Sequence, residues 1–132
     1  MNPQLQAMLQ QAIQAFQGGN FAEADLILKE VLQNNISIAE AVFELGIAYV
    51  RASRFSEASA VFTCLQLYIN NDVRIPYNLG LIHSLQGRHQ LALVNYDFAL
   101  KIQPDYIKAH SNAGFILLEL KRYEEALTAY EN

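Results

Sequence analysis

Apolar residues recur along this chain at helical spacing, in runs separated by short polar breaks. Val42, Leu45, Tyr49 and Val50 fall on one face of a helix, because residues three, four, seven and eight positions apart lie on the same side. A break at residues 52–54 precedes a second run with the same spacing. The pattern therefore predicts two helices joined by a tight turn.

The same arrangement occurs before and after this segment. The breaks at residues 18–20 and 86–88 contain glycine, which is common just past the end of a helix. Pro104 marks the end of a later run, because proline interrupts a helix interior. Pro76 stands near a helix start, where its missing N–H would have no intrahelical partner. We therefore expect an all-α fold made of helix pairs.

The predicted pairs repeat with a period of 34 residues. Gly46, Gly80 and Gly114 lie 34 residues apart. Three further columns keep this spacing: Ala24, Ala58, Ala92 and Ala126; Phe21, Phe55, His89 and Tyr123; and Leu28, Phe62, Tyr96 and Tyr130. The period defines four repeats, residues 5–38, 39–72, 73–106 and 107–132, with the last incomplete. We expect them to form one domain.

The glycine column requires a physical cause. Glycine inside a helix costs about 1 kcal/mol relative to alanine, so three at one repeat position indicate crowding there. We expect the two helices of a repeat to cross closely at the columns of Gly46 and Ala58. The aromatic columns would then fill the wider gap between repeats.

Composition narrows the class of protein. The 132 residues are 52% hydrophobic with a net charge of −4, which excludes a disordered chain. A single cysteine, Cys64, excludes an internal disulfide. The pI near 5.2 argues against nucleic acid as a partner. Neither a membrane span nor a secretory signal is evident, so we expect no membrane partner and a cytoplasmic protein.

These columns resemble the tetratricopeptide repeat, a 34-residue helix–turn–helix unit with the pattern L-G-x2-Y, then A-x3-F, then P. The matching segments are Leu45-Gly46-x2-Tyr49 with Ala58-x3-Phe62, and Leu79-Gly80-x2-His83 with Ala92-x3-Tyr96 and Pro104. The resemblance covers residues 5–132. It implies a right-handed superhelix of antiparallel helix pairs, with a concave groove lined by the first helix of each repeat. It also implies a protein-interaction scaffold.

The last repeat stops partway through its second helix. We therefore expect this chain to be the N-terminal part of a longer protein. Without a capping helix, its end would present Ala126, Leu127 and Tyr130 with little cover. We expect this end to pair either with another chain or with the next repeat of the longer protein.

Little in the sequence indicates catalysis. His83, His89 and His110 fall in three different repeat columns, so we interpret them as packing residues and expect no metal or other cofactor. Cys64 lies on a predicted second helix, where a free cysteine usually behaves as a small apolar residue. We expect no enzymatic activity within these residues.

The resemblance places several side chains in the groove. The candidate partner-binding residues are Glu40, Phe43, Glu44, Arg74, Tyr77, Asn78, Lys108 and Asn112; Phe115 lies in another inward-facing column. Phe43 and Tyr77 would supply exposed aromatic contacts. Asn78 and Asn112 would hydrogen-bond the backbone of an extended peptide, as in the asparagine ladders of repeat domains resembling those of O-linked sugar transferases.

Charge along the predicted groove changes sign. Glu40 and Glu44 would receive a basic residue, whereas Arg74 and Lys108 would attract acidic ones. The predicted ligand is a peptide segment of another protein with opposite charges at its two ends.

Other interpretations remain open. The carboxylate clamp of chaperone-binding members matches at Asn78 and Lys108 but not at Phe43, Ile47 or Asn112. An ordinary solvated helix face is the plainest alternative for the groove. The chain would otherwise be a self-associating spacer, or the N-terminal scaffold of a larger enzyme such as a glycosyltransferase.

Overall fold

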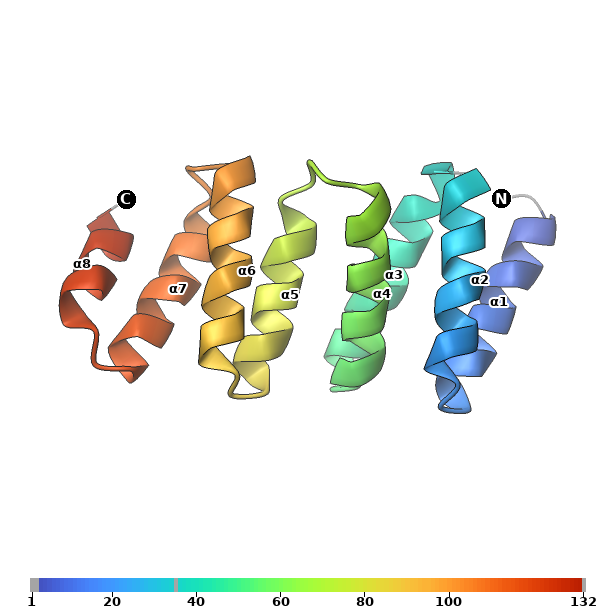
Figure 1. Ribbon diagram of the computed structural model, residues 1–132, viewed down its shortest axis with the longest axis horizontal. Coiled ribbons are helices and arrows are strands. Elements are labelled where there is room, and N and C mark those ends of the chain that lie inside the picture. The colour runs from blue at the N-terminus through green and yellow to red at the C-terminus, as the bar shows by residue number, and fades with distance from the viewer. Residues whose placement is uncertain (1–2, 35, 132) are drawn as a thin grey trace. The chain divides into compact units, whose positions relative to one another are not determined.

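The computed structural model describes residues 3–34 and 36–131, and these residues form helices joined by short turns (Figure 1). In chain order the helices are α1 (Pro3–Gln17), α2 (Phe21–Asn34), the 3-10 helix η1 (Ile36–Ile38), α3 (Ala39–Arg51), α4 (Phe55–Tyr68), α5 (Arg74–Leu85), α6 (His89–Ile102), α7 (Ile107–Glu119) and α8 (Tyr123–Glu131). The predicted all-α class is confirmed.

Consecutive helices pack as pairs: α1 with α2, α3 with α4, α5 with α6, and α7 with α8. Each pair corresponds to one 34-residue repeat. The chain divides into two compact units, Met1–Asn70 and Asn71–Asn132, each holding two repeats. We call them the N-terminal unit and the C-terminal unit.

The turn within each repeat has the same backbone geometry. One residue per turn adopts a positive φ: Gly19 (+79°), Ser53 (60°), Gly87 (+76°) and Lys121 (62°). The next residue donates its N–H to a carbonyl in the last turn of the preceding helix, as in Asn20 N to Ala15 O at 2.8 Å. This Schellman arrangement satisfies helix-end carbonyls. A side chain in this conformation costs about 1–2 kcal/mol, so Ser53 and Lys121 carry strain that the two glycines do not.

Replacing the strained turn residues tests this assignment. Ser53→Gly and Lys121→Gly should each raise the free energy of unfolding by up to about 1 kcal/mol, because glycine adopts a positive φ without steric cost. Urea denaturation measures the change. Gly87→Ala is the matched opposite and should lower stability by a similar amount. A destabilised Ser53→Gly protein would contradict the strain argument.

The glycine column packs against aromatic rings. A Cβ atom added at Gly80 would lie 2.6 Å from the ring of Tyr96, in the paired helix. The same geometry places Gly46 under Phe62 and Gly114 under Tyr130, each with a Cβ-to-ring distance of 2.8 Å. The expected close approach at the glycine column is confirmed, but the ring column, and not the alanine column, supplies the nearest atoms. The expectation that rings pack between repeats is confirmed for Tyr96, which also shares a buried cluster with Ala109 and Ala113 of the next repeat. The ring column occupies the space because each ring lies directly over the glycine of its own repeat.

The first repeat carries the complementary exchange. It has Ala12 where the others have glycine and Leu28 where they have a ring, and both side chains are fully buried. The methyl group that Ala12 adds is thus matched by a smaller side chain, Leu28, at the ring position.

The glycine–ring pair can be tested by a double-mutant cycle. Gly80→Ala gains about 1 kcal/mol of helix propensity but overpacks a fully buried ring, so we expect a net loss of about 1–2 kcal/mol. Tyr96→Leu in the same chain should recover part of this loss, because it recreates the Ala12–Leu28 combination. Denaturant unfolding of both single variants and the double variant measures the coupling. Additive effects would contradict direct packing. Gly114→Ala is the control, because the ring of Tyr130 is half exposed and can move.

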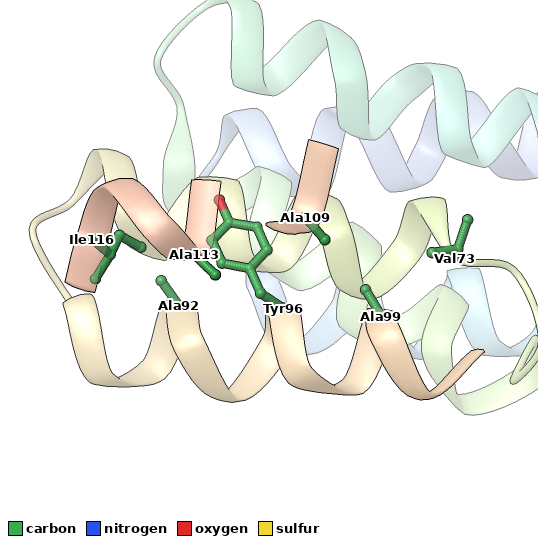
Figure 2. Packing of buried hydrophobic residues seen from close by; sticks show 7 residues of the cluster. All are labelled: Val73, Ala92, Tyr96, Ala99, Ala109, Ala113 and Ile116. Carbon is green, nitrogen blue, oxygen red and sulfur yellow. The ribbon is translucent and has the colours of Figure 1, made fainter. Parts of the chain in front are cut away.

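The core of the C-terminal unit surrounds Tyr96. Its ring rises from α6 towards α7 and lies beside Ala109 and Ala113 (Figure 2). Val73, Ala92, Ala99 and Ile116 complete the same buried cluster. In the N-terminal unit, Phe16 is buried and packs edge-on against Tyr49, with ring centroids 5.7 Å apart.

Candidate partner-binding surface

The candidate residues of the N-terminal unit lie on α3, and only two of them face solvent. Glu40 and Glu44 are exposed one helical turn apart. Phe43 is only 8% exposed, and its ring packs edge-on against Phe62 at 5.4 Å. The expectation of an exposed aromatic anchor at Phe43 is therefore wrong, because this ring belongs to the core of its own repeat.

In the C-terminal unit, α5 and α7 bring Tyr77 and Asn112 together. The Asn112 amide donates hydrogen bonds to the hydroxyl of Tyr77 at 3.1 Å and to that of Tyr96 at 3.3 Å. The ring of Tyr77 also packs edge-on against Tyr106, with centroids 5.5 Å apart. Both N–H groups of the Asn112 amide have partners in this arrangement, and its carbonyl oxygen is the group that can accept from a ligand.

The second asparagine is placed differently. Asn78 is 7% exposed, and its amide donates to the carbonyl of Arg74, one turn earlier, at 2.7 Å. The expected pair of equivalent asparagines is therefore wrong: the Asn78 amide is turned into its own helix, whereas Asn112 lies between two tyrosine hydroxyls.

The two candidate cations also differ. Arg74 forms an ion pair with Asp72, with Nη2 2.7 Å from Oδ2, and Asp72 also accepts the Arg74 backbone N–H at the start of α5. The Arg74 guanidinium accordingly lowers the pKa of Asp72. Lys108 is exposed in the first turn of α7 and makes no ion pair within the described chain. Lys108 thus carries the uncompensated positive charge.

Phe115 completes this surface. It lies two turns after Lys108 on α7 and is 59% exposed. Its position in the repeat predicted that it faces the groove. The exposed fraction of its side chain could not be predicted from the sequence, because it depends on how the neighbouring helices pack. We define the α5–α7 surface as Tyr77, Lys108, Asn112 and Phe115.

A cavity of about 460 Å³ lies elsewhere in the C-terminal unit, where α6, α7 and α8 meet. Leu93, Leu117 and Ala129 contribute to its apolar wall, and Asp97 and Arg122 to its polar rim. Nothing in the sequence pattern indicated it, because it depends on the spacing between α6 and α8.

The histidines and the cysteine are placed as parts of the helix packing. His110 Nε2 donates to the carbonyl of Pro104 at 2.7 Å, and the Nδ1 atoms of His83 and His89 are buried. Burial lowers the pKa of His83 and raises the pKa of the Cys64 thiol to about 12. The side chain of Cys64 therefore stays a neutral thiol near neutral pH, where it is a poor nucleophile.

Several apolar side chains of α7 and α8 are exposed. Leu127 and Tyr130 are uncovered as expected, but Ala126 is 1% exposed, so its assignment to the exposed end is wrong. Ala126 faces into the helix pair because it belongs to the alanine column of the repeats. Ile107, missed by sequence reasoning, is also exposed.

Helix pairs that repeat along the chain place this fold in the class of helical repeat proteins. In this chain the second, third and fourth repeats each carry one glycine–ring contact. Three models of the tetratricopeptide repeat match the sequence, at residues 9–63, 77–106 and 107–132. The chain belongs to the tetratricopeptide repeat family. None of the curated proteins matches the sequence.

Solved structures agree on the fold. A mutant of MamA superposes with a TM-score of 0.78 at 20% sequence identity, covering 96% of this chain and 93% of that one. MamA from Desulfovibrio magneticus RS-1 gives 0.68 at 19% identity, covering 96% and 72%. The first repeat domain of Spaghetti (RPAP3), bound to the HSP90 peptide SRMEEVD, gives 0.69 at 23% identity, covering 74% and 77%.

Across the described residues, the helices lack the combination of length and apolar character that a membrane span requires.

The burial of Tyr96 predicts a loss of stability at high pH. Burial raises the pKa of Tyr96 to about 12 from an ordinary value of 10.0. Its contribution to stability is therefore complete below pH 10 and is lost as the pH rises towards 12. Urea unfolding at pH 8, 10 and 11 should show a smaller pH-dependent loss for Tyr96→Phe than for the native chain. Tyr123→Phe, at an exposed ring, is the control, and an equal change in both variants would contradict the assignment.

Proposed function

We propose that this chain is a protein-interaction scaffold whose C-terminal unit binds an acidic peptide segment on the α5–α7 surface. The observation that carries this proposal is the placement of Lys108, exposed and without an ion pair in the described chain, on the same helix as the exposed ring of Phe115. An exposed cation beside apolar surface favours a peptide carrying both a carboxylate and an apolar side chain.

The remaining residues of the surface have distinct roles in this proposal. The Asn112 carbonyl oxygen accepts a backbone N–H of the peptide, because the tyrosine hydroxyls hold the amide N–H groups. Tyr77 provides a ring fixed by Tyr106 and Asn112, so it costs little conformational entropy to use. Arg74 is already neutralised by Asp72 and serves mainly to hold the start of α5.

Two findings support this class of ligand. The family is one of binding modules, and the similar repeat domain of RPAP3 was solved with SRMEEVD, a peptide with three acidic side chains. The N-terminal unit offers the opposite charge: Glu40 and Glu44 would attract a basic segment. Because each unit carries its own charged residues, the two attractions can be tested separately.

Fluorescence anisotropy with labelled SRMEEVD tests the C-terminal unit. Lys108→Glu should weaken binding at least about tenfold, which corresponds to about 1.4 kcal/mol, and should reduce the salt dependence. Phe115→Ser should weaken binding without changing the salt dependence.

The matched control is Lys101→Glu, which makes the same charge change at an exposed position of α6. Equal weakening by Lys101→Glu and Lys108→Glu would mean that only net charge matters, and would overturn the proposed site. A native chain that binds neither SRMEEVD nor a peptide with the charges reversed would overturn the function.

A further inference from the structure

The cavity between α6, α7 and α8 is separate from the α5–α7 surface. Its floor is one row of α7 side chains, His110, Ala113 and Leu117, which lie on the same side of the helix. The α7 residues of the α5–α7 surface fall on the opposite side of this helix. The volume of about 460 Å³ lies within the range of small-molecule sites, about 300–1,000 Å³.

The corresponding space in the N-terminal unit is closed. There, α2 packs directly against α4, whereas the described parts of α6 and α8 make no comparable contact. The α3 residues two repeats before Ala113 and Leu117 are Leu45 and Tyr49, and both are larger. Because α2 and α4 themselves close the space in the N-terminal unit, the cavity reflects the smaller side chains that α7 contributes to its floor.

The charged groups at the rim of the cavity leave one carboxylate without a partner. Arg122 Nε donates to Glu125 Oε1 at 2.8 Å, and these two residues neutralise each other as an ion pair. The pKa of Arg122 is raised mainly by its hydrogen bonds with Glu125, with a smaller contribution from the charge of Asp97. Asp97 itself forms no ion pair within the described chain, not even with Lys101 one turn later. The rim therefore carries one excess negative charge.

The neutral polar group of the floor is also an acceptor. His110 Nε2 donates to the carbonyl of Pro104 at 2.7 Å, so Nδ1 of the neutral ring carries a lone pair. The cavity thus combines a carboxylate and a ring nitrogen, which both accept hydrogen bonds, with the apolar side chains of Leu93 and Leu117. This combination favours a ligand with a positively charged donor and an apolar body.

We propose that this cavity binds a small organic amine whose ammonium group pairs with Asp97 and whose apolar body lies between Leu93, Leu117 and Ala129. An ammonium group has donors only, which matches the acceptors at this site. The carboxylate of Asp97 is exposed, so its attraction for the ligand is screened by salt. This proposal does not rest on the proposed peptide binding, since it uses none of the residues of the α5–α7 surface.

Nuclear magnetic resonance of the isotope-labelled chain, titrated with phenethylamine, tests the proposal. Saturable amide shifts should appear around the cavity in α6, α7 and α8, with a dissociation constant of about 1 mM, because so small a ligand makes few contacts. Phenylacetate, which has a similar body and the opposite charge, should bind about tenfold more weakly.

Two variants separate the charge from the apolar wall. Asp97→Asn should weaken phenethylamine binding about threefold and remove its salt dependence. Ala129→Leu fills part of the cavity and should weaken the binding of phenethylamine and phenylacetate alike. Asp105→Asn makes the same charge change at an exposed position outside the cavity and should leave the dissociation constant unchanged. Circular dichroism confirms that each variant remains helical.

Several outcomes would overturn the proposal. They are equal binding of phenethylamine and phenylacetate, shifts confined to other parts of the chain, and binding that both Asp97→Asn and Ala129→Leu leave intact. Binding of an acetylated phenylalanyl-lysine amide in the absence of any phenethylamine binding would replace the small amine with a basic side chain of a partner protein.

Discussion

The contact between a helix glycine and an aromatic ring is the constraint on which each of the last three repeats depends. The absence of a side chain at Gly80 lets the ring of Tyr96 pack closely against α5, and the buried ring then provides a surface for α7. The cost of glycine within a helix, about 1 kcal/mol relative to alanine, is offset by burial of a large ring. A single pair of columns thus sets both the packing within a repeat and the packing of the next helix onto it.

The same ring links the core to the surface. The hydroxyl of Tyr96 reaches Asn112, which also holds the hydroxyl of Tyr77. A residue of the α5–α7 surface is therefore positioned by a ring whose place is set by a glycine. The orientation of Asn112 follows from the packing of α6, because two tyrosine hydroxyls hold its amide. In the proposed peptide complex, such preorganisation would reduce the entropy lost on binding.

Much of the fold could be predicted from the sequence, because the 34-residue period and the helical spacing are local features. The first helices of three repeats end at residues 17, 51 and 85, immediately before the breaks that the sequence predicts. The partners of the glycines could not be predicted, since a column shows that space is scarce but not which side chain fills it. Phe43 illustrates a related failure: its helix position suggested the groove, but contact with Phe62 buries it. Asn78 failed for another reason, because its own helix supplies the acceptor.

The glycine–ring contact also bears on how the chain folds. Its two members are separated only by the rest of one helix, a turn and the start of the next helix, so little chain entropy is lost when they meet. A fold built from such local contacts has a low contact order, which is associated with rapid folding. In a repeat array, each pair can form and then add its neighbour, so folding can begin at more than one place. The second, third and fourth repeats each carry the contact, and each is therefore a potential nucleus for folding.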